Sequence, residues 1–228
     1  MTPPYRYISL ILVGMMLTAF SSTSANAAPA SMKTMLAGMQ ADAEGIVDTA
    51  LAKDVPGSQK LFHKIQQRMN QLHQHLAGQA FDERRSRELL MAYSWMRVIA
   101  LDLKQHAWTG TAIAANQLTA SVIRFTNYST LEQRDLAWMD YLARELLLLS
   151  MEDASANAQL LDARRANLVE TWGRIKTKLI RNSFRNKPLV LRGDSLMHRL
   201  QNKPKPEKSM ETARELMIFV DEVEQIKQ

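Results

Sequence analysis

Apolar positions recur at steps of three and four along most of this chain. Ile65, Met69 and Leu72 are one example, and together they place an apolar seam on one face of a helix. Proline is absent from residues 57–187, and the strict alternation typical of strands is nearly absent as well. The pattern therefore predicts an all-α fold.

Turn residues and capping side chains indicate where the helices begin and end. Residues 55–57 (Val-Pro-Gly) end the first helix, Asp82 caps the third, and Ser129 with Glu132 fits a capping box for the fifth. Short breaks between long amphipathic helices favour an up-and-down antiparallel bundle. We expect its six helices at about residues 31–53, 58–77, 82–108, 111–127, 129–151 and 155–185.

The pattern changes after Pro188, which we expect to stop the sixth helix. A connector with at most one helical turn is expected to lead into a polar linker containing Pro204 and Pro206, and Ser209 is expected to cap a last amphipathic helix. No repeat of fixed period is visible. The predicted organisation is a helical bundle at 28–187, a basic connector and linker at 188–208, and a C-terminal helix at 209–228.

The first 27 residues have the composition of an export signal. Arg6 precedes an apolar run at residues 8–20, and Ala25 and Ala27 supply the small residues at which a signal peptidase cleaves. The apolar run is too short to cross a bilayer comfortably, and no second apolar span follows. We expect a mature chain that begins at Ala28 and works in the periplasm of a bacterium, with secretion as the alternative.

The chain contains no cysteine, so disulfides, thiolate metal sites and cysteine nucleophiles are excluded. The sequence also lacks a Gly-x-Ser-x-Gly elbow, a phosphate-binding loop and a dinucleotide-binding glycine motif. We therefore expect a protein that is not an enzyme and needs no cofactor. A hydrolytic enzyme with an unrecognised site remains an alternative.

Charge is distributed unevenly along the second half of the chain. Residues 164–208 hold 13 basic and three acidic side chains, residues 130–163 hold seven acidic and two basic ones, and the last 20 residues hold five acidic and two basic ones. Such segregation indicates either a face that binds anions or neighbouring elements that neutralise one another on folding.

The sharpest local feature is a basic stripe on the predicted sixth helix. Its members recur at steps of four, three and four and so share one side of the helix. We call this set, with two cations that follow it, the predicted partner-binding residues: Arg174, Lys178, Arg181, Arg185, Lys187 and Arg192.

The leading hypothesis is a non-enzymatic accessory or binding protein of the cell envelope that docks an acidic partner through this stripe. The expected partner is an acidic envelope protein or an anionic surface polymer, and peripheral contact with a membrane stays open. Nucleic acid is not expected, because no recognition motif is present. The sequence leaves the oligomeric state undetermined.

A rival hypothesis is a copper-handling protein. Met32, Met35 and Met39 stand at steps of three and four, and thioethers bind Cu(I) in compartments that lack thiolates. The alternative is that these methionines fill the core, since the same face continues with Ile46. The five histidines lack the spacing that would place two of them on one helical face, so no metal is assigned to them.

Overall fold

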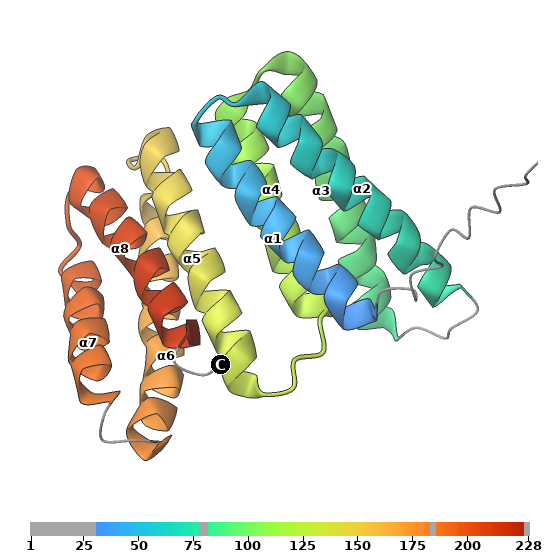
Figure 1. Ribbon diagram of the computed structural model, residues 1–228. Coiled ribbons are helices and arrows are strands. Elements are labelled where there is room, and N and C mark those ends of the chain that lie inside the picture. Colours follow the sequence, from blue (N-terminus) through green and yellow to red (C-terminus); the bar gives the residue numbers. More distant parts are fainter. Residues whose placement is uncertain (1–30, 78–81, 183–185, 226–228) are drawn as a thin grey trace, which may run out of the picture.

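The computed structural model describes residues 31–77, 82–182 and 186–225; the expected export signal at 1–27 lies outside these residues. The described residues are all-helical and contain no strand, which confirms the predicted fold class (Figure 1). The eight described helices are α1 (Met32–Leu51), α2 (Val55–Leu76), α3 (Glu83–Gln105), α4 (Trp108–Phe125), α5 (Leu131–Asp153), α6 (Ala158–Asn182), α7 (Lys187–Gln201) and α8 (Pro206–Gln225).

Capping side chains fix several of the helix starts. The Asp82 carboxylate accepts a hydrogen bond from the Arg85 backbone N–H at 2.7 Å, as predicted for α3. The predicted capping box of α5 is wrong by one residue, because the hydroxyl that accepts from the Gln133 N–H belongs to Thr130. The prediction that Ser209 caps α8 is also wrong. The helix begins at Pro206, so Ser209 lies inside its first turn, where the buried hydroxyl donates a hydrogen bond to the carbonyl of Pro204.

The expected connector after residue 187 is a full helix, α7. Pro188 lies in the first turn of α7, where the missing N–H costs no helical hydrogen bond. The prediction that Pro188 stops the sixth helix is wrong, because α6 already ends at Asn182. Val190, Leu196 and Leu200 of this helix are buried. The polar linker is correspondingly shorter than predicted, since α8 begins at Pro206.

The helices form two groups of four, α1–α4 and α5–α8, which stand side by side (Figure 1). Each group encloses its own apolar cluster: Ile46 and Met69 belong to the first, and Leu142 and Trp172 to the second. The predicted arrangement of six helices in one bundle plus a terminal helix is therefore not confirmed. In particular, α8 packs on α5 and supplies Phe219 to the second cluster.

The two groups repeat one another's buried pattern. In α1 and α5 the paired positions are 100 residues apart: Leu36, Met39, Ala43 and Ile46 correspond to Leu136, Met139, Ala143 and Leu146. In α2 and α6 they are 103 residues apart: Ile65, Met69, Leu72 and Leu76 correspond to Leu168, Trp172, Ile175 and Leu179.

The same correspondence continues in the second half of each group. In α3 and α7 the separation is 101 residues: Ala92, Met96 and Ile99 correspond to Gly193, Met197 and Leu200. In α4 and α8 it is 98: Ala115, Leu118, Val122 and Phe125 correspond to Ala213, Leu216, Val220 and Val223. Because the separation drifts from pair to pair, a search for one fixed period misses this repeat.

The two groups meet where α4 packs against α5. Ala120 and Ile123 of α4 belong to the second apolar cluster, while Leu148 of α5 belongs to the first, so each group contributes side chains to the other's core. The Asn116 side-chain amide donates to the Tyr141 carbonyl across this junction at 3.4 Å. Among the described helices, none combines the length and apolarity that a membrane span requires.

Candidate functional site

The predicted partner-binding residues do not form one free surface. Arg174 donates two hydrogen bonds of 3.1 Å to the buried carboxylate of Asp135 on α5 and one of 2.9 Å to Glu170. The hydrogen bonds with Asp135 raise the pKa of the Arg174 guanidinium above its ordinary value. Arg192 pairs with Glu222 of α8, and its guanidinium also stands 5.7 Å from the centre of the Phe219 ring.

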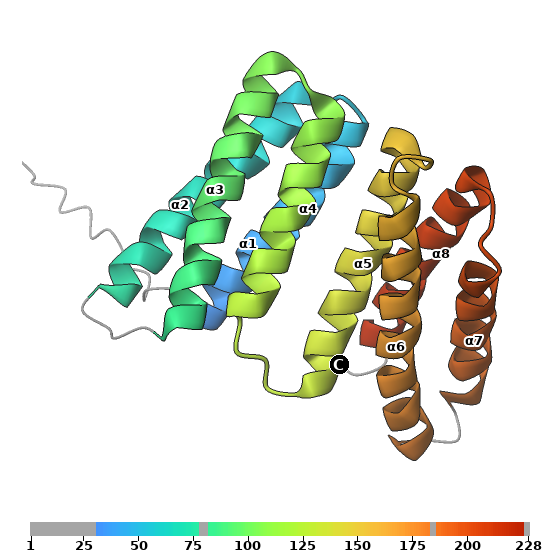
Figure 2. The ribbon, with the colours of Figure 1, turned by 180° about the vertical axis from the view of Figure 1, so that it is seen from behind.

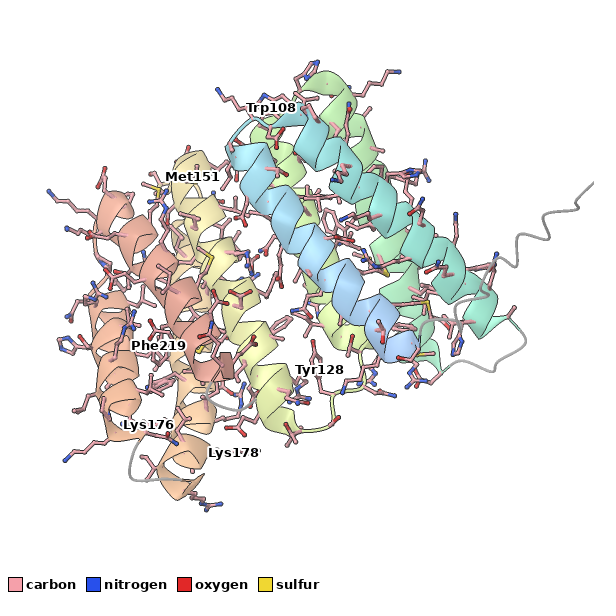
Figure 3. All side chains as sticks on the ribbon, viewed as in Figure 1. Trp108, Tyr128, Met151, Lys176, Lys178 and Phe219 are labelled. Carbon is pink, nitrogen blue, oxygen red and sulfur yellow. The ribbon has the colours of Figure 1, made fainter. Side chains whose placement is uncertain are left out.

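The other four members of this set differ in their surroundings. Lys178, near the C-terminal end of α6 (Figure 3), is half-buried and Arg181 is exposed. Within the described part of the chain neither forms an ion pair. Lys187 opens α7 and is exposed, and Arg185 lies outside the described residues.

Much of the basic segment is neutralised by carboxylates of the same chain. Arg164 forms a two-point contact with Glu145, at 2.6 and 3.0 Å, and Lys203 reaches Asp162 at 2.7 Å. Arg199 pairs with Glu215 of α8 in the same two-point manner. These contacts support the interpretation that neighbouring helices neutralise one another on folding.

A cleft at the junction of the two groups gathers a second set of arginines, which shares Arg174 with the first. The cleft holds about 630 Å³, and residues of α3, α4, α5, α6 and the α4–α5 loop line it. Its lining includes four arginines: Arg84, Arg124, Arg134 and Arg174. We call this space the arginine cleft.

Two carboxylates and an indole ring orient these arginines. Arg124 lies 3.7 Å from Glu88 and 5.1 Å, centre to centre, from the Trp138 ring. A guanidinium over an indole is held by the ring's quadrupole as well as by charge. Trp138 itself is half-buried and lines the cleft.

The remaining two arginines of the cleft are also exposed. The Arg134 side chain is 52% exposed, and its nearest carboxylate oxygen, on Asp135, is 3.9 Å away. Arg84 is exposed and makes no ion pair with any described residue. Four guanidinium groups and two carboxylates line the cleft, and Glu170 outside the lining also pairs with Arg174, so a small excess of positive charge remains.

A second groove lies on the opposite side of the junction, between α1, α5 and α8. It holds about 360 Å³ and is lined by Gln40, Glu44, Tyr128 and Glu224, among others. The Tyr128 hydroxyl, located between α1 and α5 (Figure 3), donates to the Gln40 side chain at 3.1 Å. Burial raises the pKa of Glu44 to about 7, despite the opposing effect of the Arg144 guanidinium. The two sides of the junction therefore differ in charge.

The methionines of the copper hypothesis serve mainly as packing groups. Met35 and Met39 are buried, Met39 within the first apolar cluster, and the half-buried Met32 packs against that cluster. Across the described ranges, no group of three or more His, Asp or Glu side chains is placed to hold a metal ion.

Sequence reasoning found one of the four cleft arginines, Arg174, and missed the other three. Arg84, Arg124 and Arg134 come from three different elements, and no periodic pattern connects them. The half-buried Trp138 is the one signal that could have pointed here, because an indole beside arginines is a common binding surface. No family model, curated protein or solved structure matches this chain.

Proposed function

We propose that this chain is a non-enzymatic binding protein of the bacterial cell envelope and that the arginine cleft, more than the α6 stripe, is where it docks an acidic partner. The observation that carries the proposal is the convergence of Arg84, Arg124, Arg134 and Arg174 from four helices. Guanidinium groups stay charged at any working pH and can bind a carboxylate through two parallel hydrogen bonds.

The types of side chain in the cleft favour binding over catalysis. A guanidinium does not give up its proton under ordinary conditions, so it is a poor general acid or base. The two carboxylates of the cleft, Glu88 and Asp135, each face an arginine, so both already have a charged partner. The envelope location is proposed from the export pattern of residues 1–27.

The binding test uses the chain from Ala28 onward and a fluorescent oligoglutamate peptide, followed by anisotropy at low salt and at about 0.15 M salt. Replacing both accessible arginines, Arg84→Glu with Arg134→Glu, should weaken binding at least about tenfold. Neither side chain is buried, so helical circular dichroism should not change.

A matched control reverses two charges on the stripe outside the cleft, Lys178→Glu with Arg181→Glu. If the cleft is the docking centre, this variant keeps most of the peptide affinity. Loss of affinity in the stripe variant alone would return the docking site to α6, and unchanged affinity in both variants would overturn the proposal.

A further inference from the structure

The outward side of α3 carries an apolar surface that the fold leaves uncovered. Among large apolar side chains exposed in the described residues, four belong to this one helix: Leu90, Met91, Val98 and Leu101, with exposed fractions of 66%, 40%, 38% and 53%. Figure 2 shows α3 in front of α2. Exposed apolar groups gathered in this way mark an interaction surface.

These four side chains share one face of the helix. At about 100° per residue they fall within an arc of about 100°, which we call the α3 ridge. The buried residues of the same helix, Ala92, Met96, Ile99 and Leu103, point to the opposite side. The helix is therefore apolar on two opposite faces, and the bundle uses only one of them.

Unpaired cations accompany the ridge. Arg87, Arg97 and Lys104 are exposed, and none of them forms an ion pair with another described residue. At the same angular spacing, Arg87 falls within the arc of the ridge, while Arg97 and Lys104 flank one edge of it. An apolar strip with cations beside it is the composition of helices that lie in a lipid headgroup layer.

We propose that the α3 ridge docks on an anionic phospholipid surface, with Leu90, Met91, Val98 and Leu101 among the lipid headgroups and Arg87, Arg97 and Lys104 at the phosphates. The ridge lines neither the arginine cleft nor the second groove, and all four of its side chains are exposed on the surface of the bundle. A lipid layer can deform around such a ridge. The inference does not depend on the function proposed for the cleft.

Charge argues against one alternative occupant of this surface, and shape argues against another. A second copy placed face to face would bring Arg87, Arg97 and Lys104 of both copies around one apolar strip, and like charges at close range repel. An amphipathic helix of another protein ordinarily docks in a groove, which the ridge does not provide.

The test is co-sedimentation of the chain from Ala28 onward with vesicles of phosphatidylglycerol and phosphatidylethanolamine, compared with vesicles of phosphatidylcholine alone. The wild-type chain should bind the anionic vesicles. Two double variants should each lower the partition coefficient at least about tenfold. One removes apolar side chains (Leu90→Ser with Leu101→Ser), and the other removes cations (Arg97→Gln with Lys104→Gln). All four positions are exposed, so the variants should unfold at the wild-type temperature.

The repeat supplies a matched control. Leu191 on α7 occupies the position that corresponds to Leu90 and is 60% exposed, so Leu191→Ser removes an equivalent leucine from the other bundle. This control should bind vesicles as the wild-type chain does. Failure of the wild-type chain to bind anionic vesicles, or wild-type binding by the Leu90→Ser, Leu101→Ser variant, would overturn the inference.

Two further readouts separate this inference from its alternatives. Light scattering that shows a dimer in the wild-type chain and a monomer in the leucine variant would assign the ridge to a second copy, which contradicts lipid docking. The leucine variant should keep its affinity for the oligoglutamate peptide, so failure of the cleft proposal and failure of the lipid proposal are distinguishable.

Discussion

Arg144 on α5 lies 3.7 Å from Glu44 on α1 and also pairs with Asp140 on its own helix. The contact joins the two bundles on the side opposite the arginine cleft, where Gln40 and Glu224 also face Glu44. The strength of the contact between Arg144 and Glu44 therefore depends on whether the carboxyl group of Glu44 is protonated.

The pH dependence of stability follows from Glu44, whose pKa rises from 4.5 to about 7 mainly through burial. A raised pKa means that the folded chain holds this proton more tightly, so the stabilisation is present below about pH 4.5 and is lost as the pH rises through about 7. We expect this group to lower the free energy of unfolding by up to about 3 kcal/mol between these values. Urea unfolding of the Glu44→Gln variant should show a smaller drop, since residue 44 can no longer ionise while Asp140, whose pKa burial also raises, still can. An equal drop in the variant and in the wild-type chain would contradict the assignment.

A matched pair of glycines tests the packing of α7 on α6. A Cβ at Gly193 would overlap the Trp172 ring, whereas a Cβ at Gly173 meets nothing within 4 Å. Gly193→Ala should therefore destabilise the chain by about 1–3 kcal/mol or more through overpacking. Gly173→Ala should stabilise it by roughly 0.5–1 kcal/mol, since alanine is the better helix former. Thermal unfolding measures both, and destabilisation of equal size in the two variants would show that the close contact is not the cause.

Arg174 and Arg181 lie on the same helix, but within the described residues only Arg174 pairs with a buried carboxylate. Substituting each in turn therefore compares the contribution of a paired arginine to stability with that of an exposed one. Arg174→Met leaves the buried carboxylate of Asp135 without its main partner and should cost about 1–3 kcal/mol. Arg181→Met should change stability by less than about 0.5 kcal/mol. Chemical denaturation gives both values. An equal effect of the two substitutions would mean that the Asp135 contact contributes nothing.

Substitutions of the methionines of α1 test whether these side chains fill the core or bind copper. Met39→Leu nearly conserves volume and should cost less than about 1.5 kcal/mol, while Met39→Ala should cost about 2–5 kcal/mol because it leaves a cavity. We expect a competition titration with Cu(I) to give the same result for the wild-type chain and for a variant with leucine at residues 32, 35 and 39. A loss of Cu(I) binding in that variant would revive the copper hypothesis.

The helices could be predicted from the sequence because their evidence is local. Apolar spacing and the long proline-free segment located the first six helices to within a few residues, and the Asp82 cap was correct. The break predicted at residues 55–57 was wrong, because Val55, Pro56 and Gly57 form the first turn of α2, which Asp54 caps. The error at α7 arose because Pro188 was interpreted as the end of a helix, although proline is also common in the first turn of a helix. The division into two bundles was missed because short loops favour antiparallel neighbours but do not say which helices close a core.

The arginine cleft could not be predicted because its parts are distant in the sequence. The pairing of Arg174 with Asp135 spans 39 residues, and Arg84 reaches the same cleft from another bundle. Sequence periodicity reports on one helix at a time. It could place Arg174 on the outward side of α6, but it could not identify the carboxylate opposite.

The arginine cleft takes two of its arginines, Arg84 and Arg124, from one bundle and two, Arg134 and Arg174, from the other. Its width is consequently governed by the angle at which α4 meets α5, and not by the internal rigidity of either bundle. An anion that spans the cleft would tie the two bundles together and restrict that angle. Binding of an anion in the cleft and the relative orientation of the two bundles would then be thermodynamically coupled, so a change in either one shifts the other.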